Sequence, residues 1–195
     1  MDDAIKQAIS ESISAKNAIL ADEAFLKKIQ QTAEVMVETL KSGRRVLWCG
    51  NGGSAADAQH LAAELSGRFY FDRPPLNSEA LHCNTSYLTA VANDYGYDLI
   101  YSRMINGACQ RGDVLVGIST SGNSRNIVNA FKKAKELGVI TVAFTGRSGG
   151  QMVQLADILL NVPSTDTPRI QECHIMLGHV ICCLVEKTMF GHLVK

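Results

Sequence analysis

The stretch from Val46 to Gly67, VLWCGNGGSAADAQHLAAELSG, constrains the fold more than any other part of the chain. Its apolar start, 46–49, predicts a short buried strand, and the glycine turn 50–53 follows at once. A helix is predicted next, with Ser54 as its N-cap and Gly67 as its stop. Strand, turn and helix form an anion-binding unit, because glycines let a ligand approach the backbone and the first N–H groups of a helix lack partners.

The same helix carries a candidate metal-binding or acid–base pair. His60 and Glu64 are four residues apart, so they share one helix face. A His–Glu pair at this spacing is also common on a solvated helix face. The proximity of Ser54, six residues earlier, favours a functional interpretation.

A second polar set lies in the apolar C-terminal segment, which is predicted to be a helix from about Pro168 to Phe190. Two of its members, Gln171 and His179, could complete a four-ligand site with the His–Glu pair. They are eight residues apart, about two helical turns, so they need not face one point and either can come from a neighbouring subunit. Spacing alone therefore leaves zinc an open question, and His174 is expected to be structural.

Apolar segments alternate with glycine- or hydroxyl-rich loops along the rest of the chain. Further strands are predicted at about 80–83, 114–118, 139–144 and 158–162, with helices between them. This alternation predicts an α/β fold with a doubly wound, mostly parallel five-stranded sheet flanked by helices. Ligands bind at the carboxyl ends of the strands in such sheets, and the glycine- and serine-rich loops all fall there.

The loop after the strand at 114–118 is rich in hydroxyl side chains. Ser119, Thr120, Ser121 and Ser124 lie within six residues, ahead of a helix that ends at Gly138. Serine and threonine at such a turn can serve only as helix caps. Four hydroxyls exceed what a cap needs, so we expect the loop to bind a phosphate group together with helix N-terminal amides.

Residues 1–43 show helical periodicity and form a predicted N-terminal helical arm, either one helix or two with a break near Ala21 and Asp22. At 195 residues and 46% hydrophobic content, the chain suits a single domain, 1–195. The arm can cover its own domain or pack against a second subunit, and we expect a subunit contact.

Composition excludes several classes of protein. Nineteen basic and nineteen acidic residues cancel without a basic cluster, so no nucleic-acid partner is expected. The N-terminus lacks a signal-peptide pattern, and no apolar run approaches the roughly 20 residues of a membrane span, so no membrane partner is expected. The six cysteines lack C-x-x-C spacing and are expected to be reduced. We expect a cytoplasmic protein.

The glycine turn also matches the dinucleotide fingerprint G-x-G-x-x-A, at Gly50, Gly52 and Ala55. A nicotinamide enzyme is therefore a competing interpretation. The fingerprint also requires an acidic residue at the end of the next strand, and that strand ends in Cys83 and Asn84. The missing acid argues against a dehydrogenase.

Four motifs occur in order: CGNGGSAADAQH-x-A-x-E, TAVANDYG, GISTSGNS and RIQE-x-H-x-x-x-x-H. With them the chain resembles the phosphoheptose isomerases of the sugar isomerase (SIS) fold family, over nearly its whole length. The resemblance implies a homotetramer, with active sites at subunit contacts, that converts sedoheptulose 7-phosphate to D-glycero-D-manno-heptose 7-phosphate. This step supplies heptose for bacterial lipopolysaccharide or capsule.

The resemblance also implies site residues. Its metal ligands, for one Zn²⁺ per subunit, match His60, Glu64, Gln171 and His179. Its substrate-binding positions match Asn51, Gly52, Gly53, Ser54, Glu64, Asn93, Asp94, Ser119, Thr120, Ser121, Ser124 and Gln171. Moving a carbonyl from C2 to C1 through an enediol needs an acid and a base, and we assign Glu64 as the base and His179 as the acid.

A non-catalytic binding module, such as a sugar-phosphate sensor or a replication-initiator-associating paralogue, is the alternative from another class, because this fold serves both roles. Loss of the acid–base set would favour a binding module. The chain retains His60, Glu64, Gln171 and His179, which favours the enzyme.

Overall fold

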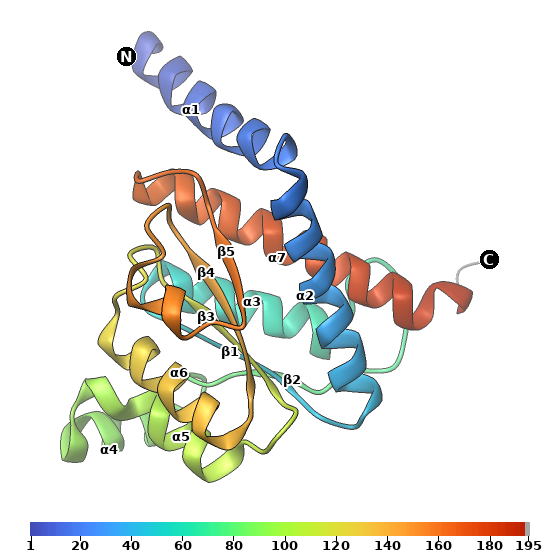
Figure 1. Ribbon diagram of the computed structural model, residues 1–195, viewed down its shortest axis with the longest axis vertical. Helices are drawn as coiled ribbons and strands as arrows, with labels where there is room; N and C mark the ends of the chain where they lie inside the picture. Colours follow the sequence, from blue (N-terminus) through green and yellow to red (C-terminus); the bar gives the residue numbers. More distant parts are fainter. Residues whose placement is uncertain (194–195) are drawn as a thin grey trace.

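The computed structural model describes residues 1–193, a five-stranded sheet covered by helices on both faces with a helix extending from one end (Figure 1). That extension is α1 (Asp2–Leu20), and α2 (Glu23–Lys41) follows it. The predicted break near Ala21 and Asp22 divides the arm into these two helices. Asp22 begins α2 as its N-cap, since its carboxylate accepts hydrogen bonds from the amides of Ala24 and Phe25, both at 3.0 Å.

The sheet is entirely parallel, in the order β2-β1-β3-β4-β5. The central strands β1 (Val46–Gly50) and β3 (Val114–Ile118) pair in register from Val46 opposite Val114 to Gly50 opposite Ile118. The others are β2 (Ser78–Ala80), β4 (Ile140–Thr145) and β5 (Ile158–Asn161). The predicted doubly wound sheet is confirmed, and its strand order reverses between β1 and β3, where such sheets bind ligands.

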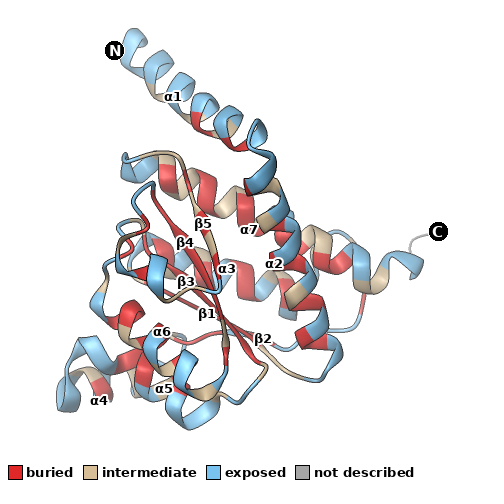
Figure 2. Cartoon of the chain, in the orientation of Figure 1, coloured by how far each residue is buried: buried red, intermediate tan, exposed pale blue. Residues whose placement is uncertain are grey.

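Both faces of the sheet are buried, as the continuous apolar strands require (Figure 2). On one face, Val46 and Trp48 pack under α1, α2, α3 (Gly53–Ser66) and α7 (Thr167–Phe190). On the other, Leu47 and Cys49 pack against α4 (Thr85–Tyr95), α5 (Ile100–Ala108) and α6 (Arg125–Leu137). Three short 3-10 helices complete the described chain: η1 (Tyr97–Leu99), η2 (Gly150–Gln154) and η3 (Gly191–Leu193).

Two predicted boundaries were wrong. The helix after the glycine turn begins at Gly53, so Gly52 occupies the N-cap position and Ser54 lies inside the first turn. Gly52 has a φ of 55°, a positive value that serine adopts with difficulty. The chain therefore turns at Gly52, and the helix begins nearer the N-terminus than predicted. The second strand covers Ser78–Ala80 instead of 80–83, because this edge strand pairs only with β1 over three residues.

The C-terminal helix α7 covers Thr167–Phe190, as the sequence predicts, and it is mostly apolar. Thr167–Leu193 is sufficiently long and apolar to cross a membrane by length and composition alone, although 44% of its most apolar stretch is buried inside the protein. In the fold, α7 packs along α2 and α3 (Figure 1). The packing of a core helix accounts for this apolar sequence.

Candidate active site

The glycine turn and the hydroxyl-rich loop, 119–124, lie side by side because β1 and β3 are neighbours in register. Asn51 of the glycine turn and Asn126 of α6 exchange two amide hydrogen bonds, of 2.9 and 2.8 Å. Asn126 is buried, and its Oδ1 also accepts the amide of Ile127 at 3.0 Å. This reciprocal pair fixes the distance between the two loops that flank the crevice.

The glycine turn follows a path that only small residues permit. A Cβ on Gly50 would lie 2.3 Å from the carbonyl oxygen of Ser54, so the end of β1 touches the first turn of α3. The buried Tyr101 of α5 donates its hydroxyl to the Gly50 carbonyl at 2.5 Å. Burial raises the pKa of Tyr101, which keeps this hydroxyl a donor. These contacts fix the path of the turn, in which the amides of Ser54, Ala55 and Ala56 already donate to the carbonyls of Asn51 and Gly52.

The hydroxyl-rich loop is not explained by helix capping. Ser124 precedes α6, but within the described residues its side chain makes no capping hydrogen bond. Its Oγ instead lies 3.0 Å from Ser119 Oγ, and Ser121 Oγ accepts the amide of Asn123 at 3.1 Å. Capping of α6 therefore does not account for the side chain of Ser124.

A hollow of about 210 Å³ opens beside this loop and is lined by Thr120, Ser121 and the side chain of Arg147, among others. A larger hollow of about 420 Å³ lies between α1 and the segment 163–169. The two share Arg147, Ser164 and Thr165, so they are neighbours. The N-terminal helix therefore reaches the vicinity of the phosphate-binding loop.

Three side chains from α3 and α7 converge on one point. His60 Nε2 lies 3.2 Å from Glu64 Oε1 and 2.9 Å from His179 Nε2. The helices approach closely beside the cluster, because Gly178 packs against Leu61 and a Cβ there would lie 2.3 Å from Leu61 Cδ1. This contact sits one residue from His179 on α7 and one residue from His60 on α3.

The cluster fits a metal ion. Its three candidate ligand atoms all lie within 4.8 Å of one another. Imidazole nitrogens and a carboxylate oxygen are ordinary zinc ligands, and bond lengths of about 2.0–2.1 Å correspond to donors about 3.3 Å apart in a tetrahedron. The separations of 2.9 and 3.2 Å are close to that value. The side chains of His60 and Glu64 are 49% and 22% exposed, so a substrate could reach them.

The remaining predicted residues lie nearer the crevice. Gln171 approaches Gly53, where a Cβ would come within 2.8 Å of its Nε2. Along α7 it lies about 12 Å from His179, at 1.5 Å rise per residue. Asn93 and Asp94 are exposed at the end of α4, where Asn93 Nδ2 donates to Asp94 Oδ1 at 2.9 Å. Tyr97, which follows, donates to Asn51 Oδ1 at 3.2 Å and ties this segment to the glycine turn.

Sequence reasoning gave no site role to two residues near the cluster, Asp57 and Phe69. Burial raises the pKa of Asp57, while the nearby His60 and His179 oppose the rise. Its spacing of three residues from His60 was the available signal. The ring of Phe69 lies 5.8 Å from that of His179 and walls the site. No sequence signal distinguishes Phe69 from the other aromatic residues.

The histidine expected to be structural is buried in the core. His174 Nε2 lies 3.1 Å from the Thr145 carbonyl oxygen, and burial lowers the pKa of His174 to about 4, against a smaller opposing effect of that contact. The ring is therefore neutral near pH 7.

All six cysteines, which lie within the described range, are free thiols, and Cys83 is exposed.

The family model and the relatives that match this chain agree on one family. A model of the SIS domain matches residues 9–146. The phosphoheptose isomerase of Aneurinibacillus thermoaerophilus is 53% identical over 190 residues, covering 97% of this chain and 96% of that protein. That of Sulfurimonas denitrificans is 52% identical over 187 residues, covering 96% of each chain.

Solved structures agree with these relatives. A phosphoheptose isomerase from Neisseria gonorrhoeae superimposes with a TM-score of 0.88 at 43% identity, covering 95% of this chain and 98% of that one. One from Francisella tularensis gives a TM-score of 0.91 at 37% identity, covering 95% and 97%.

Proposed function

From the premise that this chain belongs to the phosphoheptose isomerase family of SIS-domain proteins and is a sugar phosphate isomerase, we propose that it converts sedoheptulose 7-phosphate to D-glycero-D-manno-heptose 7-phosphate. The observation that carries the proposal is the cluster of His60, Glu64 and His179, which joins α3 to α7. It offers acid–base groups on the helix that begins at the glycine turn.

The reaction moves a carbonyl from C2 to C1, so a proton leaves C1 and another reaches C2 through an enediol. Glu64 takes the proton from C1 on a carboxylate oxygen. His179, as the acid, supplies a proton to the C2 oxygen from the ring nitrogen that does not hold the metal, which gives the enediol; the O1 hydroxyl then loses its proton as C2 gains one, which gives the aldose. Both groups lie near His60 Nε2, at 3.2 Å for Glu64 and 2.9 Å for the His179 nitrogen, so one substrate can reach both.

A zinc ion would be held by His60, Glu64 and His179, with Gln171 as the fourth ligand. When bound, it would act as a Lewis acid that polarises the substrate oxygens, an effect worth several kcal/mol. Glu64 would bind it through one oxygen, leaving the other for proton transfer. Since the Gln171 described here lies by Gly53, its role is either as a ligand across a subunit contact or as a substrate contact.

The phosphate would be bound by Ser119, Thr120, Ser121 and Ser124 with the first amides of α6. Binding energy remote from the reacting carbons would orient the sugar over Glu64. The remaining sugar contacts would come from the glycine turn and the end of α4, through Asn51, Gly52, Gly53, Ser54, Asn93 and Asp94. The two hydrogen bonds between the side chains of Asn51 and Asn126 support a fixed position for Asn51.

We extend the proposal to assembly and cellular role. The domain is 1–195, and the arm 1–43 would form subunit contacts of a homotetramer with active sites at those contacts. Exposed apolar residues on α1 support this: Ile5, Ile9 and Ile13 are 58%, 56% and 53% exposed. The enzyme would work in the cytoplasm and supply heptose for lipopolysaccharide or capsule.

A substrate panel tests the proposal. Zinc-loaded protein is incubated with sedoheptulose 7-phosphate, fructose 6-phosphate or ribulose 5-phosphate, and aldose formation is measured. We expect the seven-carbon ketose to be preferred by at least about tenfold in kcat/KM, which corresponds to 1.4 kcal/mol. His60→Ala should lose this turnover, while the exposed neighbour Gln59→Ala should keep it. Preference for a shorter ketose, or binding of the heptulose without turnover, would contradict the assignment.

A further inference from the structure

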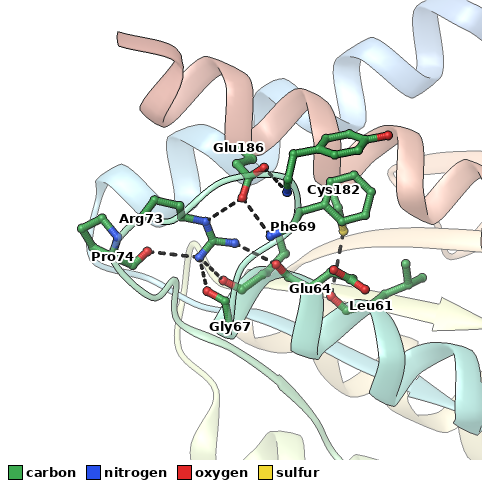
Figure 3. A network of polar contacts seen from close by, with 10 residues as sticks. Leu61, Glu64, Gly67, Phe69, Arg73, Pro74, Cys182 and Glu186 are labelled. Carbon is green, nitrogen blue, oxygen red and sulfur yellow. Dashed lines mark hydrogen bonds and ion pairs between the residues drawn. The ribbon is translucent and has the colours of Figure 1, made fainter. Parts of the chain in front are cut away.

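Two charged residues without a role in the proposed chemistry are completely buried beside the site. The side chains of Arg73 and Glu186 have 0% exposure, and Arg73 Nε lies 3.1 Å from Glu186 Oε1 (Figure 3). Arg73 belongs to the loop 67–74 after α3, and Glu186 belongs to the last turns of α7. Burying two charges is costly, so a pair placed here needs a structural or functional reason.

Arg73 closes the C-terminal end of α3. Its Nη2 donates to the carbonyl of Glu64 at 2.7 Å, and its Nη1 donates to the carbonyls of Leu65 and Gly67 at 2.7 and 2.8 Å. The last carbonyls of a helix lack intrahelical partners and carry partial negative charge, so a guanidinium satisfies both needs. One of these contacts is with the backbone of Glu64, the candidate base (Figure 3).

Glu186 holds the same loop from the other side. Its Oε1 accepts the amide of Phe69 at 2.9 Å and its Oε2 accepts the amide of Tyr70 at 2.8 Å. Burial acts to raise the pKa of Glu186, but these two amides and Arg73 outweigh it, so the pKa lies below the ordinary value. The carboxylate is therefore ionised at neutral pH, and it fixes Phe69, whose ring faces His179 at 5.8 Å.

We propose that Arg73 and Glu186 are positioning residues of the active site: their ion pair holds the end of α3, the loop 67–74 and α7 together so that Glu64 and His179 stay within ligand distance. This inference rests on the proposed metal-assisted isomerase. Both side chains are completely buried, so neither is offered to a substrate. They act through the backbone of Glu64 and through Phe69 beside His179.

A purely structural pair would affect stability without affecting the site. Buried ion pairs are often replaceable by apolar residues without loss of stability, so stability alone is a weak reason for this one. Groups that orient metal ligands typically alter metal affinity or activity by about 10–100-fold when mutated. Metal affinity measured well below the unfolding temperature therefore distinguishes the two roles.

The test variant is Arg73→Lys, which keeps the buried charge but removes the planar fork that reaches several carbonyls at once. The matched control is Arg45→Lys, which alters another arginine with an acidic partner, Asp113 at 3.8 Å, beside the amino end of β1. Zinc affinity is measured by competition with a chromophoric chelator, and kcat and KM with sedoheptulose 7-phosphate.

For Arg73→Lys we expect zinc affinity and kcat each to fall by about tenfold or more, with KM changed much less. Arg45→Lys should leave all three near wild type. Wild-type zinc affinity and kcat in Arg73→Lys would overturn the inference, as would equal losses in Arg45→Lys. If wild-type protein neither binds zinc nor turns over the heptulose, the proposed function fails instead.

A measurement on the wild-type protein covers the case in which Arg73→Lys does not fold. Hydrogen exchange of the Phe69 and Tyr70 amides is followed in metal-free and zinc-loaded protein. We expect both amides to be protected already without zinc, because Glu186 accepts them before any metal binds. Protection that develops only after zinc is added would show that the metal organises the loop, and would overturn the inference.

Discussion

Adding one methyl group at Gly178 is expected to disturb the metal site through the packing of α3 on α7. Gly178 precedes His179, and it contacts Leu61, which follows His60. In Gly178→Ala the new Cβ would lie 2.3 Å from Leu61 Cδ1 and 2.5 Å from Cδ2. The Leu61 Cγ would be 2.9 Å away, so turning the terminal methyls alone does not clear the space.

The size of the effect follows from ordinary packing distances. Carbon atoms pack at about 3.5–4.0 Å, so the helices must separate by about 1.2–1.7 Å or Leu61 must shift by that amount. Overpacking of this kind costs about 1–3 kcal/mol. Alanine is favoured over glycine in a helix by about 1 kcal/mol, so the net loss of stability is about 0–2 kcal/mol. A separation of this size moves His60 away from His179.

The matched control is Gly107→Ala in α5, where a new Cβ would meet nothing within 4 Å. It gains the helix preference without the clash, so Gly178→Ala should be about 1–3 kcal/mol less stable than this control in urea unfolding. Zinc affinity should fall in Gly178→Ala alone. Equal stability of the two variants together with wild-type zinc affinity in Gly178→Ala would refute the reasoning.

The other predictions concern the base, the phosphate loop and the buried carboxylate. Glu64→Gln should reduce kcat by about 10²–10⁴-fold while leaving assembly and substrate binding largely intact, and near-wild-type turnover would remove Glu64 as the base. Ser121→Ala should raise KM by about tenfold or more at little change in kcat, since a hydrogen bond to a charged group contributes about 1.5–3 kcal/mol. A large loss of turnover at saturating substrate would contradict its positioning role. Because the folded-state pKa of Glu186 is depressed, its contribution to stability is complete above its unfolded pKa and is lost as pH falls through the lower folded value. Urea midpoints between pH 7 and pH 3 should therefore fall less steeply for Glu186→Gln than for wild type, and parallel curves would contradict the assigned shift.

The sequence predicts those parts of the fold that depend on local patterns. The run Val114–Ile118 marks a strand buried on both faces, and the structure has β3 over those residues. Asp22 marks the start of α2 because its carboxylate caps the helix. The start of α3 was misjudged because a serine after a glycine turn is a strong capping signal, whereas the left-handed Gly52 already turns the chain. Local signals also cannot separate a core helix such as α7 from a membrane helix of the same composition.

The site is predictable only where its residues are close in sequence. The spacing of His60 and Glu64 places them on one helix face, but the approach of His179 depends on the packing of Gly178 against Leu61. His179 was a candidate ligand as a polar residue of an apolar helix, and the resemblance to a family, not the spacing, supported placing it with His60 and Glu64. The supporting contacts of Asn126, Tyr101 and Glu186 join residues 75, 51 and 113 positions apart. No sequence periodicity reports contacts of that range.

The most direct test of the account follows hydrogen exchange at the substrate carbons. Zinc-loaded protein is incubated with sedoheptulose 7-phosphate in D2O, and C1 and C2 are followed by NMR with and without a chelator. We predict aldoheptose that carries deuterium at C2, formed only when the metal is retained. Substrate that binds without forming aldoheptose or exchanging a proton would contradict the enediol mechanism and support a binding module on the same fold.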